Sequence, residues 1–273
     1  MLTRIVAALV FTPLFLAFLL FTPTLLVSGI AAVAAFELMH AVQVKNNLVR
    51  FAACAAAVLI PLCYWLRIDS WAVKAVLLGL LVILFLAAVF TYGTERAVRA
   101  EQVLFGLFGG ILYPVLMSSL VQLRMMRSGG RVPYGALYVL LPVISAFLTD
   151  TGAYFFGMFF GKHRGIVPVS PKKSVEGFIG GLLSGVVFMT LYGMVLNRLF
   201  VLGADLRIMA VYGFVGSFVT MLGDRAFSLI KRQYGIKDYG NLLPGHGGML
   251  DRFDSMSFAA PTMWLLVTLF PAF

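Results

Sequence analysis

Residues 72–92 read AVKAVLLGLLVILFLAAVFTY, an apolar run whose only charge is Lys74. A helix needs about 20 mostly apolar residues to cross the hydrocarbon core of a bilayer. Comparable runs recur along the chain, and each must be helical because lipid offers no partner to open backbone groups. The predicted spans lie at about 5–22, 24–41, 51–66, 72–92, 103–122, 136–160, 177–197, 208–230 and 255–272. The sequence therefore predicts an all-α fold, a polytopic integral membrane helical bundle of about nine transmembrane helices.

The composition agrees with this fold class. Hydrophobic residues make up 61% of the 273 residues and charged residues only 12%, and the mean hydropathy is +0.98, far above that of soluble domains. The loops are too short to fold alone, so we expect a single membrane domain over 1–273, with N-terminal helices in 1–134 and catalytic helices and cytoplasmic loops in 135–273. Arg4 and the run after it resemble a signal peptide, but that run reaches Phe21 and a second follows at once. We expect a retained helix.

The distribution of Lys and Arg predicts the orientation. With nine spans, 13 of these residues fall on one side of the membrane and 7 on the other. The richer side holds Arg4, Lys45, Arg50, Arg96, Arg99, Lys162, Arg164, Lys172, Lys173, Lys231, Arg232, Lys237 and Arg252. The positive-inside rule places this side in the cytoplasm. We therefore expect an inner (cytoplasmic) membrane protein whose basic loops, 161–176 and 231–254, face the cytoplasm.

Charge concentrates in one stretch, Ser228 to Ser255, which reads SLIKRQYGIKDYGNLLPGHGGMLDRFDS. Its charged residues are Lys231, Arg232, Lys237, Asp238, Asp251, Arg252 and Asp254, and His246 stands among Gly245, Gly247 and Gly248. Glycine lets backbone N–H groups approach phosphate oxygens closely. With a net charge of +10, this stretch predicts a site for a polyanion and a hard metal ion at the membrane surface.

Carboxylates near this stretch are candidate metal ligands. Asp224, Ser228 and Lys231 share one face of the eighth predicted helix at helical spacing. Together with Asp251 and Asp254, Asp224 could gather one Mg²⁺, which prefers oxygen ligands and leaves room for substrate phosphates. In the alternative interpretation, Asp224 pairs with Arg225 or Lys231 and Asp254 caps a helix.

Two earlier segments carry further candidates. In TDTGAYFFGMFFGK, Asp150 shares a stripe with small residues, which predicts close helix packing with Asp150 directed into the bundle. In SPKKSVEG, Ser170 begins a segment in which adjacent Lys172 and Lys173 suit a phosphate. Glu37, near the end of the second span, receives no role. With 3 histidines and no cysteine–histidine cluster, a zinc site is not expected, and neither a Walker sequence nor a G-x-S-x-G elbow occurs.

These motifs resemble the phosphatidate cytidylyltransferase (CDP-diacylglycerol synthase) family. The pattern S-x-x-K-R…K-D…P-G-H-G-G-x-x-D-R-x-D runs from Ser228 to Asp254, and SPKKSVEG and DTGAYFFGMFFGK resemble other recurrent segments of the family, in the expected order. The resemblance covers the C-terminal half well, whereas the N-terminal half matches only as hydrophobic spans. Arg225, where an apolar residue is expected, and Ser174, in place of a more usual threonine, depart from the family pattern.

The resemblance implies transfer of CMP from CTP to phosphatidate, giving CDP-diacylglycerol and pyrophosphate, with Mg²⁺ and room for a second cation. It implies metal ligation by Asp224 and Asp251, with Asp254 as a third ligand. The phosphate-holding residues would be Lys231, Arg232, Lys237, His246 and Arg252, and Lys172 and Lys173 would bind CTP or the lipid headgroup. We also place Asp150, Ser170, Ser228, Asp238, Gly247 and Gly248 in this site.

Other functions stay open from the residues. One is a related CTP-dependent enzyme, which either transfers CMP to another lipid phosphate, such as that of an isoprenoid ether lipid, or acts as a lipid kinase. The other is an ion-coupled transporter using Asp150 and Asp224, although no inverted repeat of the kind common in transporters is visible. The expected partners are CTP and phosphatidate in the bilayer, with no nucleic acid, and a second copy of the chain in a homo-oligomer, most simply a dimer.

Overall fold

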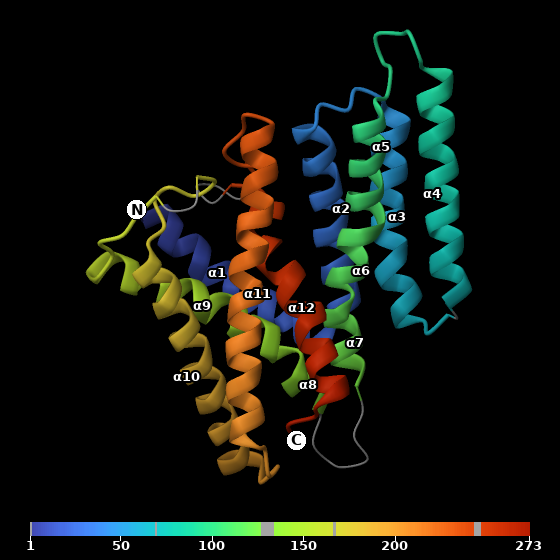
Figure 1. Cartoon of the computed structure of the whole chain (residues 1–273). Coiled ribbons are helices and arrows are strands. Elements are labelled where there is room, and N and C mark those ends of the chain that lie inside the picture. The colour runs from blue at the N-terminus through green and yellow to red at the C-terminus, as the bar shows by residue number, and fades with distance from the viewer. Residues whose placement is uncertain (1, 69, 127–133, 166–167, 243–246) are drawn as a thin grey trace. The chain divides into compact units, whose positions relative to one another are not determined.

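The computed structural model describes residues 2–68, 70–126, 134–165, 168–242 and 247–273, with side chains from Thr12 onward. These residues form helices joined by short loops, without a named strand among them (Figure 1). The helices are α1 (Leu2–Phe21), α2 (Pro23–Ala41), α3 (Asn47–Trp65), α4 (Ser70–Phe90), α5 (Ala100–Leu107), the π-helix η1 (Phe108–Leu112), α6 (Tyr113–Met117), α7 (Ser119–Met125), α8 (Tyr134–Tyr138), α9 (Leu140–Phe159), α10 (Val175–Phe200), α11 (Leu206–Gln233) and α12 (Leu250–Leu269).

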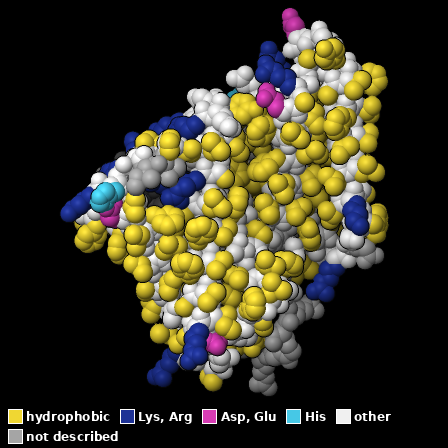
Figure 2. Space-filling model, viewed as in Figure 1, with side chains coloured by type: hydrophobic (Ala, Val, Ile, Leu, Met, Phe, Trp, Pro, Cys, Tyr) yellow, Lys and Arg dark blue, Asp and Glu magenta, His cyan; other side chains and the backbone are white. Residues whose placement is uncertain are grey.

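Seven helical runs among the described residues are long and apolar enough to cross a membrane. They are Pro23–Ala41, Asn47–Trp65, Ser70–Phe90, Ala100–Met125, Tyr134–Phe159, Val175–Phe200 and Leu206–Gln233. Figure 2 shows hydrophobic side chains covering most of the visible surface, with Lys and Arg at its margins. The predicted all-helical membrane fold is therefore confirmed. The other two predicted spans correspond to α1 and to α12, which carries three charged residues in its first turns.

The chain divides into two compact units, which we describe in turn. The first comprises Met1–Met125 and Gln233–Phe253. Within it, α2 packs on α3, and η1 packs on both. Gly109 and Gly110 permit this approach, because a Cβ at Gly110 would lie 3.2 Å from the Cα of Ala53. The buried Gln102 amide donates hydrogen bonds to the carbonyls of Val42 and Gln43, fixing α5 against the end of α2.

The second unit comprises Met126–Arg232 and Asp254–Phe273. Here α9 and α10 pack closely through small residues, since a Cβ at Gly177 would lie 2.8 Å from the Ala153 carbonyl oxygen. The Thr149 hydroxyl donates to the Ser217 hydroxyl over 2.8 Å, which joins α9 to α11. Asp150 is exposed and lies outside this packing face. Its carboxylate nevertheless raises the pKa of the buried Asp254 carboxyl, so the structure places Asp150 near Asp254 while the neighbouring Thr149 makes the contact with α11.

Candidate active site

In the second unit, the segment that precedes α10 meets α11. The Lys173 ammonium group donates a hydrogen bond to the Asp224 carboxylate, and the two form an ion pair. Ser174 fixes the end of this segment, because its side chain accepts a hydrogen bond from the Gly177 N–H and caps α10. Lys172 is exposed beside it. The sequence predicted a phosphate site and a metal ligand separately, and the structure brings one residue of each set together.

Asp224 also follows a point at which α11 approaches α12. A Cβ at the preceding residue, Gly223, would lie 3.1 Å from the Asp254 carbonyl oxygen and 2.9 Å from the Phe258 ring. Asp254 is only 6% exposed, and its carboxylate accepts hydrogen bonds from the N–H and the hydroxyl of Ser255, over 2.6 and 3.2 Å. Because α12 begins at Leu250, Asp254 lies inside the helix and the alternative role as its N-cap is wrong.

The environment of Asp254 suits a cation. Asp254 lies outside the seven apolar spans, and burial raises the pKa of its carboxyl, with the Asp224 carboxylate raising it further. Two carboxylates so placed could both stay charged if a divalent ion lay between them, and Mg²⁺ is usually held by one or two carboxylates together with substrate phosphates. Among the residues that the structure describes, no three His, Cys, Asp or Glu side chains form a metal-binding group. A Mg²⁺ ion held by Asp224 and Asp254 would therefore take its other oxygen ligands from substrate or water.

In the first unit, Asp251 organises the glycine-rich loop. Its Oδ2 accepts hydrogen bonds from the N–H groups of Tyr239, over 2.8 Å, and Gly248, over 3.0 Å. Gly247 has φ +82°, a conformation that L side chains rarely adopt, and a Cβ there would lie 3.1 Å from the same oxygen. We expected the glycines to let backbone N–H groups reach a phosphate. In this structure the Gly248 N–H group donates to Asp251 instead.

Glu37 is the residue that the sequence analysis missed. Its carboxylate is buried, 6% exposed, and accepts hydrogen bonds from the N–H groups of Met249 over 2.9 Å and Leu250 over 2.8 Å. These groups begin α12, where unpaired N–H donors and the helix dipole favour an anion. A Cβ at Gly240 or Gly248 would lie 2.5 or 2.6 Å from the Glu37 carboxylate, so both glycines make room for it. The signal for this role was a carboxylate within an otherwise apolar span.

The remaining predicted site residues fall in both units. Ser228 is buried and Lys231 half-buried on α11 in the second unit, and Arg232 is exposed at its end. The first unit holds Lys237, Asp238 and Arg252, all of which are exposed. Ser170, half-buried, lines a pocket with Lys173. His246 lies outside the described residues.

The fold and these residues define an integral membrane protein that concentrates carboxylates and cations at the ends of its last helices. The chain belongs to the Cytidylyltransferase family, whose family model matches residues 2–270. It is similar to proteins named phosphatidate cytidylyltransferase, and the chain spans about half the length of these curated relatives. The protein of Staphylococcus epidermidis is 41% identical over 133 residues, which are 49% of this chain and 50% of the relative. That of Bacillus subtilis is 40% identical over 141 residues (50% and 49%), and that of Mycobacterium bovis 39% over 137 residues (50% and 43%).

Proposed function

We propose that this protein transfers CMP from CTP to phosphatidate, giving CDP-diacylglycerol and pyrophosphate. The observation that carries the proposal is the placement of Lys173 on Asp224, beside the point where α11 approaches Asp254. This arrangement pairs a phosphate-binding cation with two carboxylates that fit Mg²⁺. Family membership and the names of the relatives support the same reaction.

The chemistry asks little of a general base. An oxygen of the lipid phosphate attacks the α-phosphorus of CTP, and the bond between that phosphorus and the α,β-bridging oxygen breaks, releasing pyrophosphate. The nucleophile is already an anion, so the difficulty is to bring two anions together and hold them in line. When bound, Mg²⁺ supplies charge screening and polarises the phosphoryl oxygens.

This chain's own residues would do the holding. Asp224 and Asp254 are the proposed Mg²⁺ ligands, joined by Asp251 on the strength of its place in the D-R-x-D motif. Lys173 would hold a phosphate oxygen when substrate competes with Asp224 for its ammonium group. The cations of 231–252 would neutralise the triphosphate and the departing pyrophosphate. These residues are Lys231, Arg232, Lys237 and Arg252, with His246 assigned from the motif.

The reaction is tested by following two labels. Purified protein in nanodiscs receives phosphatidate, Mg²⁺ and CTP labelled at either the α- or the γ-phosphorus. The proposal predicts α-label in a lipid product and γ-label in pyrophosphate. Transfer of γ-label to lipid would instead show a lipid kinase, and product formation only with an isoprenoid ether lipid phosphate would change the substrate.

The orientation and the assembly are also proposals. The excess of Lys and Arg in the loops at 161–176 and 231–254 supports a site facing the cytoplasm across the inner membrane. A cysteine replacing Lys172 on a cysteine-free background should react with an impermeant maleimide only from the cytoplasmic side of the membrane in sealed vesicles. Labelling from the opposite side would refute the orientation. We expect a homodimer by light scattering in detergent, and a monomeric mass would exclude it.

A further inference from the structure

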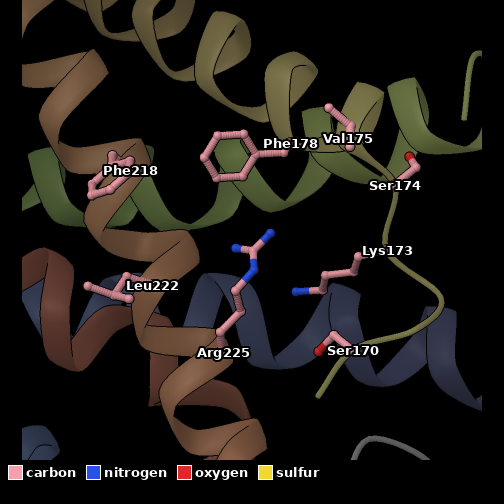
Figure 3. Close-up of a pocket in the computed structure, with 8 residues that line it drawn as sticks. All are labelled: Ser170, Lys173, Ser174, Val175, Phe178, Phe218, Leu222 and Arg225. Carbon is pink, nitrogen blue, oxygen red and sulfur yellow. The ribbon is translucent and has the colours of Figure 1, made fainter. Parts of the chain in front are cut away.

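A pocket of about 300 Å³ lies in the second unit, formed by the segment before α10, the first turn of α10 and the middle of α11. Its lining residues are Ser170, Lys173, Ser174, Val175, Phe178, Phe218, Leu222 and Arg225. Figure 3 shows Lys173 and Arg225 extending from different elements toward the same space, with Ser170 beside Lys173. The pocket thus has a cationic side and an apolar side.

Arg225 is held in position on the cationic side. Its Nη1 donates a hydrogen bond to the Met221 carbonyl oxygen over 2.7 Å, and its guanidinium carbon lies 5.2 Å from the centre of the Phe178 ring. A guanidinium has further N–H donors, in a planar fork that matches phosphate oxygens. Lys173 lines the same space while its ammonium group is paired with Asp224, so an anion bound there would meet the Arg225 guanidinium and compete with Asp224 for Lys173.

The apolar side continues along the membrane span. Phe218 and Leu222 are each 49% exposed although they line the pocket. Phe214 and Val211 precede them at helical spacing on α11 and are also about half exposed, at 53% and 52%. Both belong to the span Leu206–Gln233, so this exposed stripe runs from the pocket along the apolar length of the helix.

We propose that this pocket binds the phosphate end of an acyl-chain lipid, with Arg225 gripping the phosphate and Phe218 and Leu222 contacting the glycerol and the first part of an acyl chain. The inference rests on the proposed function in one respect, which is that the lipid is phosphatidate. Charge and shape favour this ligand over a nucleotide. A triphosphate and a ribose placed against the apolar wall would lose hydration without hydrogen-bond partners, whereas a phosphomonoester on a hydrocarbon chain matches both sides of the pocket.

Kinetics separate the two substrates. Arg225→Gln should raise the KM for phosphatidate about 10- to 100-fold, as expected for loss of one charge-assisted contact, and leave the KM for CTP within about twofold. Arg225→Lys should recover part of the loss, because a lysine keeps the charge and loses the fork. The matched control is Arg207→Gln, an exposed arginine in the first turn of the same helix, about 27 Å away along its axis. It should leave both KM values unchanged.

A binding measurement without CTP keeps this inference separate from the reaction. Benzoylphenylalanine in place of Phe218 should cross-link labelled phosphatidate on irradiation. Excess unlabelled phosphatidate should compete with it, and phosphatidylcholine should not. Arg225→Gln should reduce the cross-link about tenfold or more, and Arg207→Gln should not. The inference would be overturned if Arg225→Gln raised the KM for CTP instead, or if this variant cross-linked phosphatidate with the same yield as the parent protein. If the parent protein cross-linked phosphatidate normally but formed no lipid product, only the proposed reaction would be overturned.

Discussion

Replacing Glu37 by Gln should slow the proposed CMP transfer, because it disturbs the start of α12. The Glu37 carboxylate accepts hydrogen bonds from the Met249 and Leu250 N–H groups, and all of these groups are buried or half-buried. A glutamine offers one carbonyl oxygen and turns an amide NH₂ toward the other donor, so one charge-assisted bond is lost. Such a bond is worth about 1.5–3 kcal/mol. Asp251 lies in the same helical turn as Leu250. We therefore expect loss of this bond to displace Asp251 and lower kcat about 10- to 100-fold.

The assay combines turnover with a structural readout. Initial rates are measured in nanodiscs at saturating CTP, phosphatidate and Mg²⁺, and the loop 233–253 is monitored by limited trypsin cleavage after Lys237 and Arg252. Glu37→Gln should lower the rate and speed cleavage. The control is Glu101→Gln, which removes an exposed carboxylate that pairs with Arg99 over 3.4 Å and should change neither. A Glu37→Gln protein with normal turnover and normal trypsin resistance would refute the role of Glu37 in positioning α12.

Two further predictions concern the same loop. Gly247→Ala should destabilise the protein by about 1–2 kcal/mol, because alanine is strained in a left-handed conformation, and should also lower turnover by crowding Asp251. The control Gly235→Ala, at φ +67° with open space around it, should lower stability but not turnover. Equal turnover in both variants would show that the contact with Asp251 is unimportant. Arg252→Ala should lower kcat/KM for CTP or phosphatidate about 10- to 100-fold through loss of a phosphate contact. The control Arg198→Ala, which removes an exposed arginine in the last turn of α10, should not lower it. Equal activity of the two variants in substrate titrations would show that Arg252 serves membrane orientation and does not bind phosphate.

The helices could be predicted from the sequence because their signal is local. An apolar run is sufficient to indicate a span, and the run at 72–92 agrees with α4, Ser70–Phe90. The last predicted span also forms a helix, but α12 starts before it, at Leu250, because Glu37 satisfies the first N–H groups of that helix. Nothing in the run after residue 254 could show that earlier start.

The site was only partly predictable because its contacts join distant parts of the chain. Lys173 and Asp224 were each identified from their surroundings, yet their pairing spans 51 positions. Glu37 lies 212 positions from Met249, and no local pattern encodes such a contact. The predicted stripe of small residues around Asp150 does pack, since Ala153 lies against Gly181 of α10, but no local pattern could show that the Asp150 carboxylate lies near Asp254.

The most direct test of the central claim, CMP transfer supported by a carboxylate-bound Mg²⁺, is the rate of α-labelled lipid formation by Asp224→Asn. The matched control is Asp205→Asn, which changes the carboxylate whose Oδ1 accepts from the Arg207 N–H over 2.8 Å at the other end of α11. We expect Asp224→Asn to lose activity by about 100-fold or more at saturating Mg²⁺, with normal insertion and thermal stability, while Asp205→Asn keeps its activity. Near-normal labelling of lipid by Asp224→Asn would contradict the account.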